Sequence, residues 1–160
     1  MSVVLIIVSI SGCSNNNSHI YNSSKFSFKI PSGWSQTGDK NDYFVLFTKG
    51  KQNNNGEYNS SMQVTTQSAE NFNGLSWLVS DFINESQRNN ITIITQESRK
   101  IAGVDGYRID IQDNYGKNSS YTIFIKENLL YTIQFGRPDG NIASINDDIE
   151  TVLNSFQTWN

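Results

Sequence analysis

Between Tyr107 and Phe135 the sequence alternates apolar and polar residues in three short segments. Their apolar positions are Tyr107, Ile109 and Ile111, then Tyr121, Ile123 and Ile125, then Leu129, Tyr131, Ile133 and Phe135. Alternation with a period of two predicts β-strands. Tight turns at 113–116 and 127–128 separate the segments, so we expect an antiparallel meander.

The second side of this meander is more polar. It carries Arg108, Asp110, Gln112, Thr122, Lys126, Thr132 and Gln134. We interpret this side as facing solvent, and the alternative is that it forms a binding face.

Earlier in the chain, strands are predicted at 25–30, 42–48, 62–65 and 91–94. The segment 42–48 has apolar residues on both sides, which is typical of a central strand covered on both faces.

Two stretches repeat apolar residues at helical spacing instead. The first carries Leu75, Leu78, Val79, Phe82 and Ile83, with Asn73 as the expected N-cap and Asn89-Asn90 as the expected end. The second closes the chain with Ile142, Ile145, Ile149, Val152, Leu153 and Phe156. Each helix has one apolar face and must lie on the sheet. The sequence therefore predicts an α+β domain with a mostly antiparallel β-sheet flanked by helices.

Trp77 lies on the first helix but away from its apolar stripe, about 200° around the axis from Leu75 at 100° per residue. We expect it to pack beneath a neighbouring loop. The alternative is that Trp77 contacts a partner.

The first thirteen residues differ from the rest. An apolar run from Val3 to Ile10 is followed by Ile10-Ser11-Gly12-Cys13, and this run is too short to span a bilayer. The pattern resembles the lipobox of prokaryotic lipoproteins, in which a signal peptidase cuts before the cysteine and the thiol carries a lipid. The resemblance implies that Ile10, Ser11 and Gly12 form the processing site and that Cys13 is lipidated.

The expected organisation is a signal peptide at 1–12, a lipid anchor and polar tether at 13–24, and one domain at 25–160. The protein is then anchored in the cell membrane on its extracytoplasmic side. The leader departs from the usual pattern because nothing before Cys13 is charged, which is expected if the start is assigned too far downstream. The alternative is a buried N-terminal strand with an ordinary core cysteine.

Composition excludes several classes of function. The formal charge is −3, which gives no electrostatic reason to bind nucleic acid. One Cys and one His exclude disulfide scaffolds, zinc knuckles and iron–sulfur clusters. His19 lies in the expected tether, and no nucleophile elbow or phosphate-binding loop is present. We therefore expect no catalytic residues, no metal site and no cofactor.

Carboxylates are the remaining candidates for acid–base chemistry or metal binding. Asp110 and Asp113 lie near a predicted strand end, and Asp147, Asp148 and Glu150 lie on the closing helix. Acidic residues on a solvent-exposed face account for both groups without a site.

Three short motifs resemble PsbP-like domains. They are Phe26-Ser27-Phe28-Lys29-Ile30-Pro31-Ser32-Gly33-Trp34, then Ile101-Ala102-Gly103-Val104-Asp105-Gly106-Tyr107, and the closing Asn154-Ser155-Phe156. The resemblance covers residues 21–159 and implies an antiparallel sheet between helices, an α/β/α sandwich. The family includes an extrinsic photosystem II subunit, a Ran-binding import factor and uncharacterised archaeal surface lipoproteins, and this chain resembles the last group most. The family implies no shared catalytic residues.

The leading hypothesis is a non-catalytic binding or accessory domain, attached to the membrane by a lipid, with an unidentified protein partner or small ligand. One alternative is a carrier for a small apolar ligand, which needs a closed pocket among the aromatic residues. The other is a metal- or carboxylate-dependent hydrolase, which needs converging carboxylates with perturbed pKa values.

Overall fold

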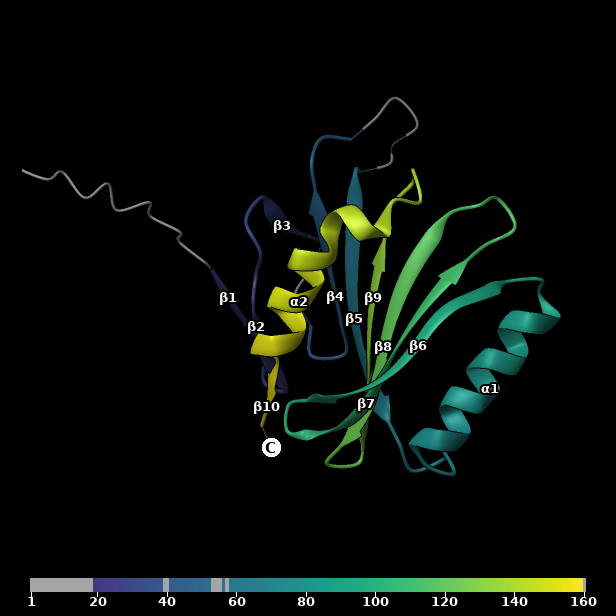
Figure 1. Ribbon diagram of the computed structural model, residues 1–160. Helices are drawn as coiled ribbons and strands as arrows, with labels where there is room; N and C mark the ends of the chain where they lie inside the picture. Colours follow the sequence, from purple (N-terminus) through teal and green to yellow (C-terminus); the bar gives the residue numbers. More distant parts are fainter. Residues whose placement is uncertain (1–18, 39–40, 53–55, 57, 160) are drawn as a thin grey trace, which may run out of the picture.

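The computed structural model describes residues 19–38, 41–52, 56 and 58–159. Within these residues seven antiparallel strands form a large sheet in the order β3-β4-β5-β9-β8-β7-β6, and three form a small sheet in the order β1-β2-β10 (Figure 1). The large sheet comprises β3 (Trp34–Thr37), β4 (Phe44–Lys49), β5 (Ser60–Ser68), β6 (Thr92–Ile101), β7 (Val104–Gln112), β8 (Asn118–Lys126) and β9 (Leu129–Gly136). The small sheet comprises β1 (Ile20–Asn22), β2 (Phe26–Lys29) and β10 (Gln157–Thr158).

The helices lie on opposite sides of the large sheet. Figure 1 shows α1 (Leu75–Arg88) on one side, and α2 (Asn146–Ser155) with the small sheet on the other. The short 3-10 helix η1 (Ile142–Ile145) leads into α2. We call the two sides of the large sheet the α1 face and the α2 face. The predicted α+β class, with a mostly antiparallel sheet flanked by helices, is confirmed.

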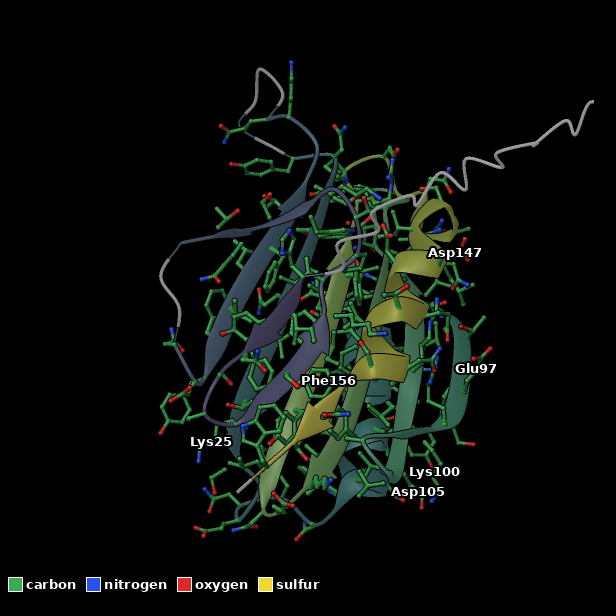
Figure 2. The ribbon with its side chains drawn as sticks, turned by 90° about the vertical axis from the view of Figure 1, so that its left-hand side faces the viewer. Lys25, Glu97, Lys100, Asp105, Asp147 and Phe156 are labelled. Carbon is green, nitrogen blue, oxygen red and sulfur yellow. The ribbon has the colours of Figure 1, made fainter. Side chains whose placement is uncertain are left out.

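A cluster of aromatic rings forms the core on the α2 face. Phe156 follows α2 directly, and its ring centroid lies 5.4 Å from Phe26, 5.7 Å from Phe28, 5.6 Å from Phe124 and 6.0 Å from Tyr131. The rings of Phe124 and Tyr131 stack at 4.9 Å. Figure 2 looks onto this side and shows Phe156 beside the small sheet. The small sheet and the end of α2 are therefore held on the large sheet by ring contacts.

A second, smaller core lies under α1. Val79 is buried, and Leu75, Leu78, Phe82 and Ile83 pack with it against the sheet, as the helical stripe predicts. The sheet residues of this core come mainly from β7 and β8: Ile109, Ile111 and Ile123 are buried, and Tyr107, Tyr121 and Ile125 are partly buried. The helix thus covers the part of the α1 face formed by β6, β7 and β8. Among the described helices, none lies over β3, β4 and β5 (Figure 1).

The prediction that the polar side of the meander faces solvent is wrong. In the register of β8 and β9, Thr122 lies opposite Ile133 and Phe124 lies opposite Tyr131. The apolar residues of β9 therefore share the α2 face with Thr122, whereas Thr132 and Gln134 lie on the α1 face. Thr122 is 1% exposed beneath the α2 layer. Both faces carry apolar cores here, so alternation within one strand does not show which face it buries.

The motif at 101–107 contains two glycines, Gly103 and Gly106, and each is required by the local backbone structure. Ala102 and Gly103 have φ values of 50° and 84°, so both central residues of this hairpin loop are left-handed, as in the tight turns that join twisted strands. At Gly106 a Cβ atom would lie 2.9 Å from Ile101 Cδ1 and 3.0 Å from Phe124 Cβ. The second glycine therefore lets β7 approach the core closely.

Several predicted boundaries change. Gly74, with φ 94°, is the N-cap of α1 instead of Asn73, and no side chain caps the helix there. The predicted end at Asn89 is confirmed. Strand β6 is longer than the predicted 91–94. Strand β4 is internal, but Phe44 on its α1 face is 38% exposed, so the prediction of cover on both faces is wrong.

The aromatic cluster predicts the effect of truncating Phe156. Replacing a buried Phe by Ala removes its apolar contacts and leaves a cavity, so we expect Phe156→Ala to lower the free energy of unfolding by about 3–5 kcal/mol. The matched control is Tyr115→Ala, because Tyr115 is 87% exposed; we expect a change below about 0.5 kcal/mol. Urea unfolding followed by circular dichroism measures both. Equal effects of the two substitutions would contradict the packing role of Phe156.

Candidate functional site

The structure brings two of the candidate carboxylates to one arginine. Asp110 lies on β7 and Glu150 on α2, and both accept hydrogen bonds from Arg108 on the α2 face of β7. Arg108 is 8% exposed. We call Arg99, Arg108, Asp110 and Glu150 the Arg108 cluster.

The donors of Arg108 are shared among several acceptors. Its Nε donates to Asp110 Oδ1 and to Ser120 Oγ, both at 3.1 Å. Its Nη1 donates to Asn146 Oδ1 at 2.9 Å and to Glu150 Oε1 at 3.1 Å, and its Nη2 donates to Asp110 Oδ2 at 3.3 Å. The buried cation is thus compensated from both its own strand and the facing helix, as a buried charge requires.

Arg99 of β6 completes the cluster through a bidentate ion pair. Its Nη1 and Nη2 donate to Glu150 Oε1 at 2.8 Å and to Glu150 Oε2 at 2.9 Å. These hydrogen bonds lower the pKa of Glu150 below its ordinary value and raise the pKa of Arg99. Glu150 is therefore ionised at neutral pH, and two arginines and two carboxylates balance in charge.

This arrangement suits positioning better than proton transfer. A general acid at neutral pH needs a carboxyl pKa raised towards 7, and the arginines shift the pKa of Glu150 the opposite way. A hollow of about 350 Å³ lies beside the cluster, and Arg108, Asp110, Asn146 and Ile142 are among the residues that line it. The cluster therefore attaches α2 to the sheet, next to a hollow that is lined by both polar and apolar residues.

The remaining carboxylates do not join this cluster. Asp148 Oδ2 accepts from Trp34 Nε1 at 2.9 Å and from Lys49 Nζ at 2.7 Å, which ties α2 to β3 and β4. Asp147 is exposed. Asp113 Oδ1 accepts from the backbone amides of Tyr115 and Lys117 at 2.9 and 2.8 Å, so it stabilises the predicted turn. No group of three or more His, Cys, Asp or Glu side chains suited to a metal ion occurs among the described residues.

The other candidate site residues from the sequence are Trp77 and the lipobox-like residues 10–13. Trp77 is 44% exposed on α1, so the expectation that a loop covers it is wrong, and its contact with a partner stays a prediction. Ile10, Ser11, Gly12 and Cys13 lie outside the described residues. Within the described part of the chain, neither helix has the length and apolarity needed to cross a bilayer.

Sequence patterns missed a second surface, the part of the α1 face that α1 leaves uncovered. We call the α1-face side of β3, β4, β5 and β9 the open face. It contains Leu46, Gln63, Thr65, Thr132 and Gln134, all of intermediate exposure. At its end a hollow of about 410 Å³ is lined by residues that include Thr48, Tyr58, Ser61, Ser119 and Gly136. The polar alternation of β5 was visible in the sequence, but strand order was needed to assemble the surface.

The pKa of Glu150 predicts a pH-dependent contribution to stability. Because the folded pKa lies below the unfolded one, the stabilisation is present above about pH 4.5 and is lost as the pH falls through the folded value. We expect Glu150→Gln to lower the free energy of unfolding by about 2 kcal/mol at pH 7, less than for a fully buried pair because Glu150 is 33% exposed.

Urea unfolding at pH 7 and pH 3 tests this, and the deficit should shrink at pH 3. Asp81→Asn on the exposed side of α1 is the matched control and should have little effect at either pH. A deficit that does not depend on pH would contradict the ion-pair account.

Comparisons with known proteins agree on the fold. The chain matches the solution structure of the PsbP protein of the cyanobacterium Synechocystis with a TM-score of 0.63 and 16% identity, over 88% of this chain and 92% of that one. LpqN of Mycobacterium tuberculosis matches with a TM-score of 0.57 and 7% identity, over 92% and 88%. The Ran-binding protein Mog1p of Saccharomyces cerevisiae matches with a TM-score of 0.51 and 8% identity, over 82% and 89%.

These identities are low, so the structural matches establish a shared fold and nothing finer. No curated protein matches the sequence significantly. The sequence profile of the PsbP family, however, matches residues 15–158, which is nearly the whole chain. The chain therefore belongs to the PsbP family.

Proposed function

We propose that this protein is a non-catalytic binding module of the PsbP family, held on the extracytoplasmic side of the cell membrane by a lipid on Cys13. Among PsbP-like proteins this is the arrangement of the archaeal surface lipoproteins that the sequence resembles. The observation that carries the proposal is the position of Cys13 relative to the domain. The family match begins at residue 15, two residues after the lipobox-like Ile10-Ser11-Gly12-Cys13.

This position supports a leader that is separate from the domain. A lipoprotein cysteine becomes the first residue of the mature chain, and a polar stretch then separates the lipid from the fold. Residues 14–18 are Ser-Asn-Asn-Asn-Ser, a polar composition of the kind that separates a lipid from a domain. A leader of this kind is an export signal, which is consistent with a module that acts outside the cytoplasm.

The state of the charged residues supports binding over catalysis. Glu150 is held as an anion by Arg99, Asp110 accepts hydrogen bonds from Arg108, and Asp148 accepts hydrogen bonds from Trp34 and Lys49. His19 is exposed and lies next to β1, outside the Arg108 cluster. A hydrolase would need at least one of these groups in a proton-transfer role.

The carrier hypothesis is the weaker alternative for a related reason. It requires the aromatic residues to line a closed pocket for an apolar ligand. Phe26, Phe28, Phe124, Tyr131 and Phe156 instead contact one another, at centroid separations of 4.9–6.3 Å. These rings therefore pack against one another in the core and do not line a ligand pocket.

Replacing the cysteine tests the anchor. A lipid chain contributes about 0.8 kcal/mol of membrane affinity for each buried CH₂ group, so we expect Cys13→Ala to move the protein from the membrane pellet to the soluble fraction. Intact-mass analysis should show a wild-type chain that begins at Cys13 and carries lipid, and a variant without lipid.

Ser14→Ala is the matched control, because it alters the neighbouring residue and leaves the thiol in place. It should remain lipidated and membrane-bound. Full membrane retention of Cys13→Ala, or a bare thiol and an uncut leader in the wild type, would refute the proposal.

A further inference from the structure

A row of five small residues, four of which carry a hydroxyl group, crosses the open face and ends on β8. Direct cross-strand pairs place Ser35 beside Thr48, Thr48 beside Ser61, Ser61 beside Gly136, and Gly136 beside Ser119. We call these five residues the hydroxyl row. Neighbouring strands lie about 4.8 Å apart, so the row is about 19 Å long. Its side chains are short, and the row is therefore a shallow trough across the sheet.

A second row runs beside the first and includes two longer amide side chains, Gln63 and Gln134. On the open face it consists of Thr37, Leu46, Gln63 and Gln134, again as direct cross-strand partners. It ends at Tyr121 of β8, whose ring lies 5.1 Å from that of Phe82 on α1 and so belongs to the covered part of the sheet. Gln63 and Gln134 lie side by side at its centre, and each amide can both donate and accept hydrogen bonds. The trough thus has amide groups along one wall.

Gly136 leaves the floor of the trough open. A Cβ atom at this position would lie 3.4 Å from Ser61 Oγ and 3.8 Å from Ser119 Oγ, so a side chain would fill the space between the two hydroxyls. The hollow of about 410 Å³ lies here, with Tyr58 and Pro138 on its border. Its volume falls within the usual range for small-molecule sites, about 300–1,000 Å³.

The charges around this hollow balance. Arg137 donates from Nε to Asp139 Oδ1 at 2.8 Å and from Nη2 to Asp139 Oδ2 at 2.5 Å, which lowers the pKa of Asp139 to about 2. Lys117 and Asp113 contribute one charge of each sign to the border. The hollow therefore offers no net charge to attract an ionic ligand.

These features fit one class of ligand. A neutral sugar presents hydroxyl groups that donate and accept hydrogen bonds together with an apolar ring face. The serine hydroxyls of the row and the glutamine amides match the first property, whereas the buried Thr48 hydroxyl is hydrogen-bonded to Thr37 at 2.8 Å. The ring of Tyr58 offers an apolar surface for the second. A long, uncharged trough matches a linear chain of sugars better than a compact molecule.

We infer that the open face binds a neutral linear oligosaccharide, laid along the hydroxyl row with one sugar ring in the hollow above Gly136. The inference rests on the proposed binding function and adds its ligand class. It does not depend on the lipid at Cys13.

Calorimetric titration of the full chain tests the inference. The protein is purified in a detergent without a sugar headgroup, and the probes are maltohexaose, mannohexaose and N-acetylchitohexaose. We expect at least one of them to bind, and Gly136→Val to weaken that binding by at least about tenfold, because the valine side chain occupies the floor of the trough. The backbone at Gly136 is extended, so valine is compatible with the strand.

Ser98→Val is the matched control, because Ser98 is an exposed serine on β6, outside the open face. It should bind as the wild type does, and circular dichroism checks that both variants are folded. Absence of binding to all three probes, or equal binding by Gly136→Val, would overturn the inference. So would tighter binding of an acidic galacturonate hexamer, or occupation of this face by a partner protein without any response to sugar.

Failure here is distinguishable from failure of the proposed function. Membrane release of Cys13→Ala is measured without any ligand, so an anchored protein that binds no oligosaccharide would retain its location and lose only this site.

Discussion

The helices cover the two faces of the large sheet unequally, and the rest of the structure follows from that difference. On the α2 face, ring contacts around Phe156 and the ion pairs of Glu150 and Asp148 hold α2 and the small sheet in place. On the α1 face, α1 covers only the part formed by β6, β7 and β8. A sheet face left in water must be polar, and the residues of β3, β4, β5 and β9 that point there are mainly Ser, Thr and Gln. The surface available for recognition is therefore a consequence of how little α1 covers.

The motifs that relate the chain to its family have structural roles in the fold. Gly33, with φ 81°, precedes the buried Trp34, whose Nε1 reaches Asp148. Gly106 admits Phe124 into the core, and Ser155 Oγ accepts from the amide of Lys29 at 2.9 Å beside Phe156. None of these residues belongs to the open face. Members of the family can thus share a scaffold while differing in what this surface binds, and membership alone does not define the ligand.

The sequence predicted the elements better than their arrangement. The apolar stripe of Leu75, Leu78 and Val79 predicted α1, and the short turns predicted the meander, because these signals are local in the sequence. The shared solvent-facing polar side predicted for the three meander strands was wrong, since Thr122 and Ile133 lie on one face and become neighbours only through cross-strand pairing. The Arg108 cluster joins residues 42 positions apart in the chain, and the hydroxyl row joins five strands. Both depend on tertiary structure, so no local pattern contains them.

Thiol labelling in intact cells tests the account most directly, because it reports location and exposure together. Cys13 is the only cysteine in the sequence and is blocked by lipid in this account, so an introduced cysteine is the only thiol that reacts. A membrane-impermeant maleimide should label Ser61→Cys, on the exposed open face, and should spare Thr122→Cys, which is 1% exposed on the α2 face. Labelling of Ser61→Cys only after lysis, or equal labelling at both positions, would contradict the account.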